Sequence, residues 1–103
     1  MKIIAYDNFK PGVTLDELRP YLRDEVSNVW RLWKAGIVRE NYARADVGGV
    51  VIVFEVDSVE TAKRYVDDFP LTRAGLLEWV WHREGAGPIY KITGTEWLAA
   101  GES

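Results

Sequence analysis

The segment from Thr14 to Gly36 constrains the fold more than any other part of the chain. Apolar side chains recur in it at helical spacing, and at about 100° per residue they form one apolar face. This face consists of Leu15, Leu18, Leu22, Val26, Val29 and Trp33. Thr14 and Glu17 stand in the spacing of a capping box, and Val13 and Leu18 in that of a hydrophobic staple. The pattern predicts an amphipathic helix that stops at Gly36.

Two residues of this helix depart from the regular pattern. Pro20 lacks a backbone N–H, so we expect the helix to bend or to restart near Arg19. Glu25 falls inside the apolar face, where a carboxylate loses hydration and must find a partner or raise its pKa. A raised pKa is what a general acid or base needs at neutral pH. The alternative is a glutamate at the helix margin whose carboxylate reaches water or an arginine.

The rest of the chain predicts four strands and a second helix. The expected strands are residues 2–9, 37–44, 50–56 and 76–82, with a short additional strand at 89–92. The second helix begins at Asp57 or Ser58, where Asp57 and Glu60 have capping-box spacing, and Pro70 ends it. Residues 71–75 are expected to form a loop. The resulting order, β-α-β-β-α-β, is the α+β ferredoxin-like arrangement.

This arrangement places both helices on one face of the sheet and leaves the other face bare. Residues 50–56, VVIVFEV, are apolar on both faces apart from Glu55, so the bare face needs a cover. We expect a homodimer or a higher homo-oligomer, in which two sheets close into a dimeric α+β barrel. Residues 1–98 are expected to form one domain, and residues 99–103 a flexible tail.

Composition excludes several classes of protein. The chain has 103 residues, a net charge of −3 with both signs interspersed, one histidine and no cysteine. The absence of a basic patch argues against a nucleic-acid partner, and the absence of a long apolar run argues against membrane insertion. Without cysteine, disulfides and thiol catalysis are excluded, and a lone histidine disfavours a metal site. The N-terminal residues do not form a signal peptide, so we expect a cytoplasmic protein without a cofactor or a metal.

Three sequence segments resemble the muconolactone isomerase-like family of dimeric α+β barrels. They are DEVSNVWRLWKAGIVRENYAR, VVIVFEVDSVETA and FPLTRAGLLEWV, and the similarity covers roughly residues 1–83. Its most specific pieces are Asp24-Glu25 ahead of Gly36, Ser58-Val59-Glu60, and the Pro70-Leu71 pair. In that family a helix glutamate is implicated in moving a proton on an unsaturated lactone. The resemblance assigns this role to Glu25.

A proton shift next to a carbonyl needs a base and a group that stabilises charge on the oxygen. Glu25 is the expected base, and Arg39 the expected partner of the enolate or of a substrate carboxylate. The alternative for Arg39 is a salt bridge with Glu55 or Glu78. The candidates for contacts with a small-molecule substrate are Tyr6, Asn8, Trp30, Tyr42, Glu78 and His82.

Three classes of function remain open at this point. The first is a cofactor-free isomerase, or a related lyase or cyclase, that acts on a small unsaturated carbonyl compound. The second is a cofactor-independent or haem-type monooxygenase of the same barrel, for which Asn8, His82 and the tryptophans are the candidate residues. The third is a non-catalytic small-molecule-binding or assembly protein. Isomerase-type catalysis is the preferred interpretation.

Overall fold

The computed structural model describes residues 1–46 and 48–83. The elements are β1 (Lys2–Phe9), α1 (Leu15–Lys34), β2 (Val38–Ala43), β3 (Val50–Glu55), α2 (Val59–Asp67), α3 (Pro70–Arg73) and β4 (Leu77–Arg83). The predicted short strand at 89–92 and the predicted tail at 99–103 lie outside the described residues. No helix in the described ranges has the length and apolar character needed to cross a membrane.

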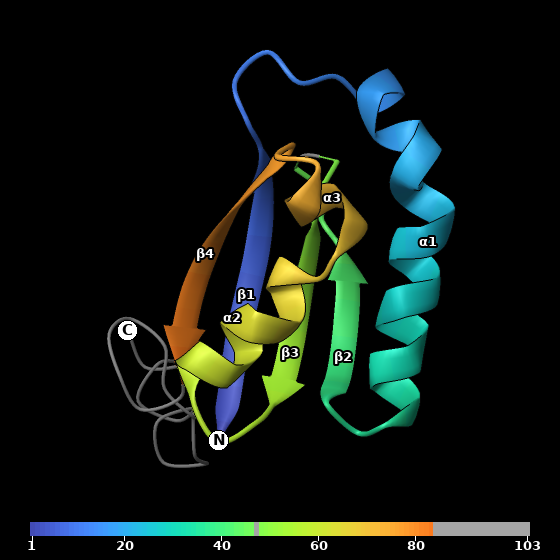
Figure 1. The fold of residues 1–103 in the computed structure, drawn as a ribbon. Helices are drawn as coiled ribbons and strands as arrows, with labels where there is room; N and C mark the ends of the chain where they lie inside the picture. The colour runs from blue at the N-terminus through green and yellow to red at the C-terminus, as the bar shows by residue number, and fades with distance from the viewer. Residues whose placement is uncertain (47, 84–103) are drawn as a thin grey trace, which may run out of the picture.

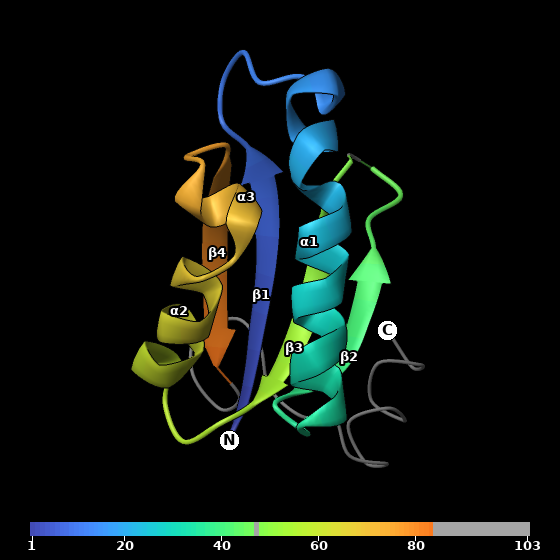
Figure 2. The ribbon, with the colours of Figure 1, turned by 45° about the vertical axis from the view of Figure 1, so that its right-hand side comes forward.

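The four strands form one antiparallel sheet in the order β2-β3-β1-β4. The three helices lie on the same face of this sheet, with α1 along β2 and β3 and the pair α2 and α3 toward β4 (Figures 1 and 2). The predicted α+β class and the ferredoxin-like order of strands and helices are therefore confirmed. We call the side of the sheet that carries the helices the helical face, and the other side the open face.

Strand register assigns alternate residues to these two faces. Ile3 and Ala5 of β1 pair with Phe54 and Ile52 of β3, and all four are buried in the main core under the helices. Asp7 is the next of these alternate residues along β1, and it lines a cavity on the helical face. Tyr6 pairs with Val51 and with Val80, so these three residues share the open face.

Apolar residues of the helices complete two adjoining clusters. Leu32, Val66 and Phe69 pack against the sheet in the larger cluster, and Leu18 of α1 packs with Leu71 and Leu77 in the smaller one. Other large side chains of α1 stay exposed, and Val26 has an exposed fraction of 67%. The apolar face of α1 is therefore only partly covered, and a cavity remains between this helix and the sheet.

The helix ends differ in detail from the sequence prediction. Thr14 is the N-cap of α1 as expected, but its side chain makes no capping bond. Ser58, rather than Asp57, caps α2, because the Ser58 hydroxyl accepts the Thr61 N–H at 3.1 Å. Asp57 stands one residue earlier, and its carboxylate instead accepts the Thr61 hydroxyl at 2.6 Å.

Two proline predictions were also wrong in part. Helix α1 runs from Leu15 to Lys34 without a break at Pro20, so the predicted restart near Arg19 does not occur. Pro70 does follow the end of α2, but it then opens the short helix α3 where a loop was predicted. Proline is well suited to this position, because the first residue of a helix has no intrahelical acceptor for its N–H.

Candidate functional site

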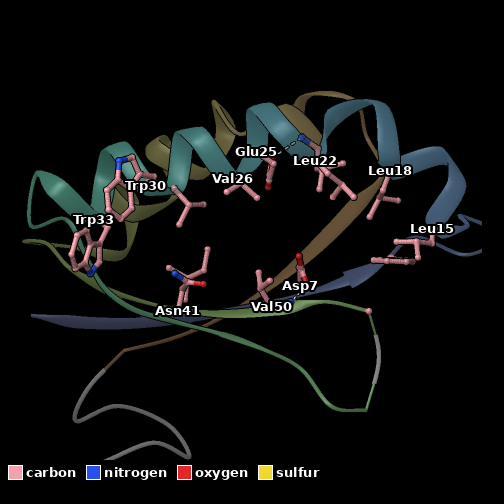
Figure 3. Close-up of a pocket in the computed structure, with 15 residues that line it drawn as sticks. Asp7, Leu15, Leu18, Leu22, Glu25, Val26, Trp30, Trp33, Asn41 and Val50 are labelled. Carbon is pink, nitrogen blue, oxygen red and sulfur yellow. Dashed lines mark hydrogen bonds between the residues drawn. The ribbon is translucent and has the colours of Figure 1, made fainter.

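A cavity of about 250 Å³ lies between α1 and the helical face of the sheet. Its roof is the apolar face of α1, and its floor comes from β1, β2 and β3 (Figure 3). The lining residues are Asp7, Phe9, Leu15, Leu18, Leu22, Glu25, Val26, Val29, Trp30, Trp33, Asn41, Gly48, Val50, Ile52 and Leu71. The roof of the cavity thus consists of the sequence-predicted helix face, with Glu25 and Trp30 added.

Two carboxylates face one another across this cavity. Glu25 points down from α1, and Asp7 points up from β1 (Figure 3). The half-buried Glu25 accepts the Leu71 N–H at 3.0 Å through Oε1. Loss of hydration raises the pKa of Glu25; the Leu71 bond opposes this shift, and the negative charge of Asp7 adds to it. Glu25 is therefore a carboxyl group that holds its proton to a higher pH than a free glutamate.

Asp7 is more deeply buried than Glu25, with an exposed fraction of 4%. Its Oδ1 accepts the Val50 N–H at 2.8 Å, which ties the carboxylate to the start of β3. Burial raises the pKa of Asp7, while the Val50 bond and the nearby positive charge of Arg44 act in the opposite direction. Both carboxyl groups of the cavity thus have raised pKa values, and both shifts come mainly from desolvation.

Gly49 allows the backbone to approach Asp7 closely. A Cβ atom at this position would lie 2.2 Å from Oδ1 of Asp7 and 2.9 Å from its backbone oxygen. Any side chain at position 49 would therefore displace the carboxylate.

The opposite end of the cavity is aromatic. Trp30 and Trp33 of α1 are stacked, with ring centroids 5.0 Å apart and an interplanar angle of 20°. Their exposed fractions are 56% and 48%, so both rings remain accessible to a ligand. Asn41 of β2 lies below them and adds a side-chain amide (Figure 3). This end offers a flat aromatic surface together with the side-chain amide of Asn41.

The structure brings together only two of the residues that the sequence analysis proposed. Glu25 and Trp30 line the cavity. The other candidates belong to the open face, on the far side of the sheet; they are Tyr6, Asn8, Arg39, Tyr42, Glu78 and His82. Successive strand residues point to opposite faces, and on β2 the register shift between Val38 and Glu40 also changes which residues face the helices.

Arg39 shows this correction most clearly. It lies in a shallow depression of the open face together with Lys2 and Glu55. The sheet therefore separates it from Glu25, and it is not positioned to stabilise an enolate in the cavity. Among the described residues, no ion pair joins Arg39 to Glu55 or to Glu78.

The residues grouped for an oxygenase are also dispersed. Asn8 and His82 belong to the open face, where the His82 ring stacks on Tyr6 at 6.1 Å. Trp79 and Trp81 contact the core on the helical face. The described residues contain no cluster of three or more metal-binding side chains.

Asp7 and Asn41 are the polar cavity residues that the sequence analysis missed. The sequence does contain a signal for Asp7, because it is the next alternate residue after Ile3 and Ala5 and so shares their face of the strand. No comparable signal marked Asn41. The register shifts between Val38 and Glu40, and this irregularity moves Asn41 onto the helical face.

No protein-family model matches the chain, and no curated protein matches it in sequence. Solved structures do share its fold. One is the 5-chloro-2-hydroxyhydroquinone dehydrochlorinase TftG from Burkholderia phenoliruptrix AC1100, in complex with 2,5-dihydroxybenzoquinone. It has a TM-score of 0.69 and 20% identity, and the match covers 88% of this chain and 100% of that chain.

A second is muconolactone isomerase, with a TM-score of 0.66 and 20% identity over 88% of this chain and 98% of that chain. The chain therefore has the fold that the resemblance predicted.

Proposed function

We propose that this chain catalyses a proton shift on a small unsaturated carbonyl or lactone compound, with Glu25 as the base. The observation that carries the proposal is the position of Glu25 in a mainly apolar cavity, opposite a second carboxyl group and with a raised pKa. A base of this kind holds and releases protons closer to neutral pH than a free glutamate does. The cavity has room for a small ring.

The proposed reaction conserves every atom. Glu25 removes a proton from the carbon next to the carbonyl group, and the electrons of that C–H bond move into an enolate. Glu25 then returns the proton to the far carbon of the conjugated system, which moves the double bond. When Asp7 holds a proton it supports the enolate, because a carboxylic acid donates a hydrogen bond to a developing negative oxygen.

The two carboxyl groups are suited to opposite roles. The charge of one raises the pKa of the other, so removing a proton from the first makes it harder to remove one from the second. A state with one proton shared between Asp7 and Glu25 supplies one base and one acid. The names of the two structural neighbours, an isomerase and a dehydrochlorinase, fit this proposal, because an isomerisation and a loss of HCl can each begin with removal of a proton.

The first prediction tests Glu25 with a β,γ-unsaturated lactone such as α-angelica lactone. The Glu25→Gln substitution keeps an acceptor for the Leu71 N–H and removes the base, so isomerisation should fall by about 10²-fold or more. The measurement is proton NMR in D₂O, which follows the shifted double bond and deuterium uptake. Glu78→Gln is the matched control, because it removes the same charge from the open face.

Equal rates for the wild type and the Glu25→Gln protein would refute the catalytic assignment. The same conclusion would follow if Glu78→Gln lowered the rate as strongly as Glu25→Gln. Circular dichroism of both variants checks that the fold is unchanged.

A further inference from the structure

Among the described residues, those that line the cavity carry negative charge and no positive charge. Asp7 and Glu25 are its ionisable groups, and every other lining side chain among the described residues is uncharged. A ligand carboxylate placed between them would be repelled, and the repulsion is strongest where water is excluded. Building on the proposed function, we propose that this cavity selects a single-ring ligand that carries no carboxylate or other anionic group.

The positive charge of Arg44, which is close to this part of the fold, lies outside the cavity. Arg44 donates to the backbone oxygen of Asp7 and to the side-chain oxygen of Asn8, and its other nitrogens bind Asp46. Its guanidinium group lies 5.1 Å from the centre of the Tyr6 ring, over the open face. Arg44 therefore binds the backbone oxygen of Asp7 rather than its carboxylate, and it does not line the space that a ligand would fill.

The dimensions of the cavity limit the ligand to one ring. Its volume is about 250 Å³, and a cavity of about 150 Å³ is known to hold one benzene molecule. The stacked pair Trp30 and Trp33 supplies a flat wall at one end. A six-membered ring with one or two small substituents fits these limits, and the charge of those substituents is then the main basis for selection.

Three probes of nearly the same shape separate charge from size. Benzamide is neutral, benzoate carries one negative charge, and benzamidine carries one positive charge. Each is titrated into the full-length protein at neutral pH, and binding is followed by the NMR shifts of the Trp30 and Trp33 indole N–H groups. We expect benzamide to bind at least about 10-fold more tightly than benzoate, and benzamidine at least as tightly as benzamide.

The variants test whether the cavity carboxylates cause the selection. Glu25→Gln removes one negative charge from the cavity, so the affinity ratio of benzamide to benzoate should shrink at least about three-fold. Glu78→Gln removes one negative charge from the open face, so it should leave the affinity ratio of benzamide to benzoate unchanged. Asp7→Asn should act in the same direction as Glu25→Gln, which provides a second variant if one of the two fails to fold.

Binding of benzoate as tightly as benzamide would overturn the inference, as would an unchanged ratio in both cavity variants. Failure of all three probes to shift the indole signals would also overturn it, because a single-ring ligand would then not enter. None of the probes can undergo the proton shift. Selective binding without isomerisation of any lactone would therefore refute the proposed function alone.

Discussion

Asp7 is a carboxyl group held in apolar surroundings by one backbone hydrogen bond from Val50. Its pKa is raised above the ordinary aspartate value of 3.8, mainly by burial. Between 3.8 and the pKa of the folded state, the folded chain therefore holds a proton that the unfolded chain has released. The free energy of unfolding falls as the pH rises through this window, and the loss is complete above the folded pKa.

The second prediction follows from this fall in the free energy of unfolding with rising pH. Asp7→Asn keeps an oxygen that accepts the Val50 N–H and removes the buried negative charge. At pH 7 the variant should be more stable than the wild type, and the difference should vanish as the pH falls below 3.8. Urea denaturation between pH 3 and pH 8 measures it. A variant that is less stable at pH 7 would show that the Val50 bond to the charged carboxylate outweighs desolvation.

The sequence alone did not show which of the alternating strand residues face the cavity. Glu25 was found because a helix with a clear apolar face shows where each side chain points. On β1 the same reasoning was available, since Asp7 shares the row of Ile3 and Ala5, but Tyr6 and Asn8 were chosen instead. On β2 the irregularity between Val38 and Glu40 changes the parity, and this depends on pairing with β3, which sequence reasoning does not provide.

At the scale of elements, the four described strands and the two longer helices were predicted to within one or two residues. Their patterns are strong because each buries apolar side chains at a fixed period. The short helix α3 was missed because four residues are too few to show a period. It matters for the site, since its second residue, Leu71, donates the N–H that Glu25 accepts.

The third prediction concerns Pro20, which stands on the exposed side of α1. Its ring has no N–H to donate to the carbonyl of Asp16, so the first turns of the helix lack one bond. Pro20→Ala should restore this bond and raise the free energy of unfolding by about 1–3 kcal/mol, as measured by urea denaturation. Tyr21→Ala is a control on the neighbouring position and should give no such gain. A less stable Pro20→Ala protein would show that the proline shapes the entry into α1.

At the scale of the whole molecule, none of the helices that the structure describes covers the open face of the sheet (Figure 3). Apolar side chains occupy its centre, and they come from Ile4, Tyr6, Val51, Val53 and Val80. Charges of both signs surround them, with Lys2 and Arg39 near Glu55 on one side. A surface with an apolar centre and mixed charges at its edge is suited to pairing with a rotated copy of itself.

The last prediction is that the chain forms a homodimer through this face. Light scattering at micromolar concentration should give at least twice the 11.8 kDa mass of one chain. Val51→Lys places a charge at the centre of the face and should shift the mass to that of one chain, because an unpaired buried charge opposes association. Asp67→Lys, at the end of α2, is the control for an added lysine and should leave the dimer intact. A wild-type protein that remains a monomer would contradict the proposal.

If Val51→Lys dissociates the dimer while the Trp30 and Trp33 signals still respond to benzamide, the cavity binds its ligand within one chain.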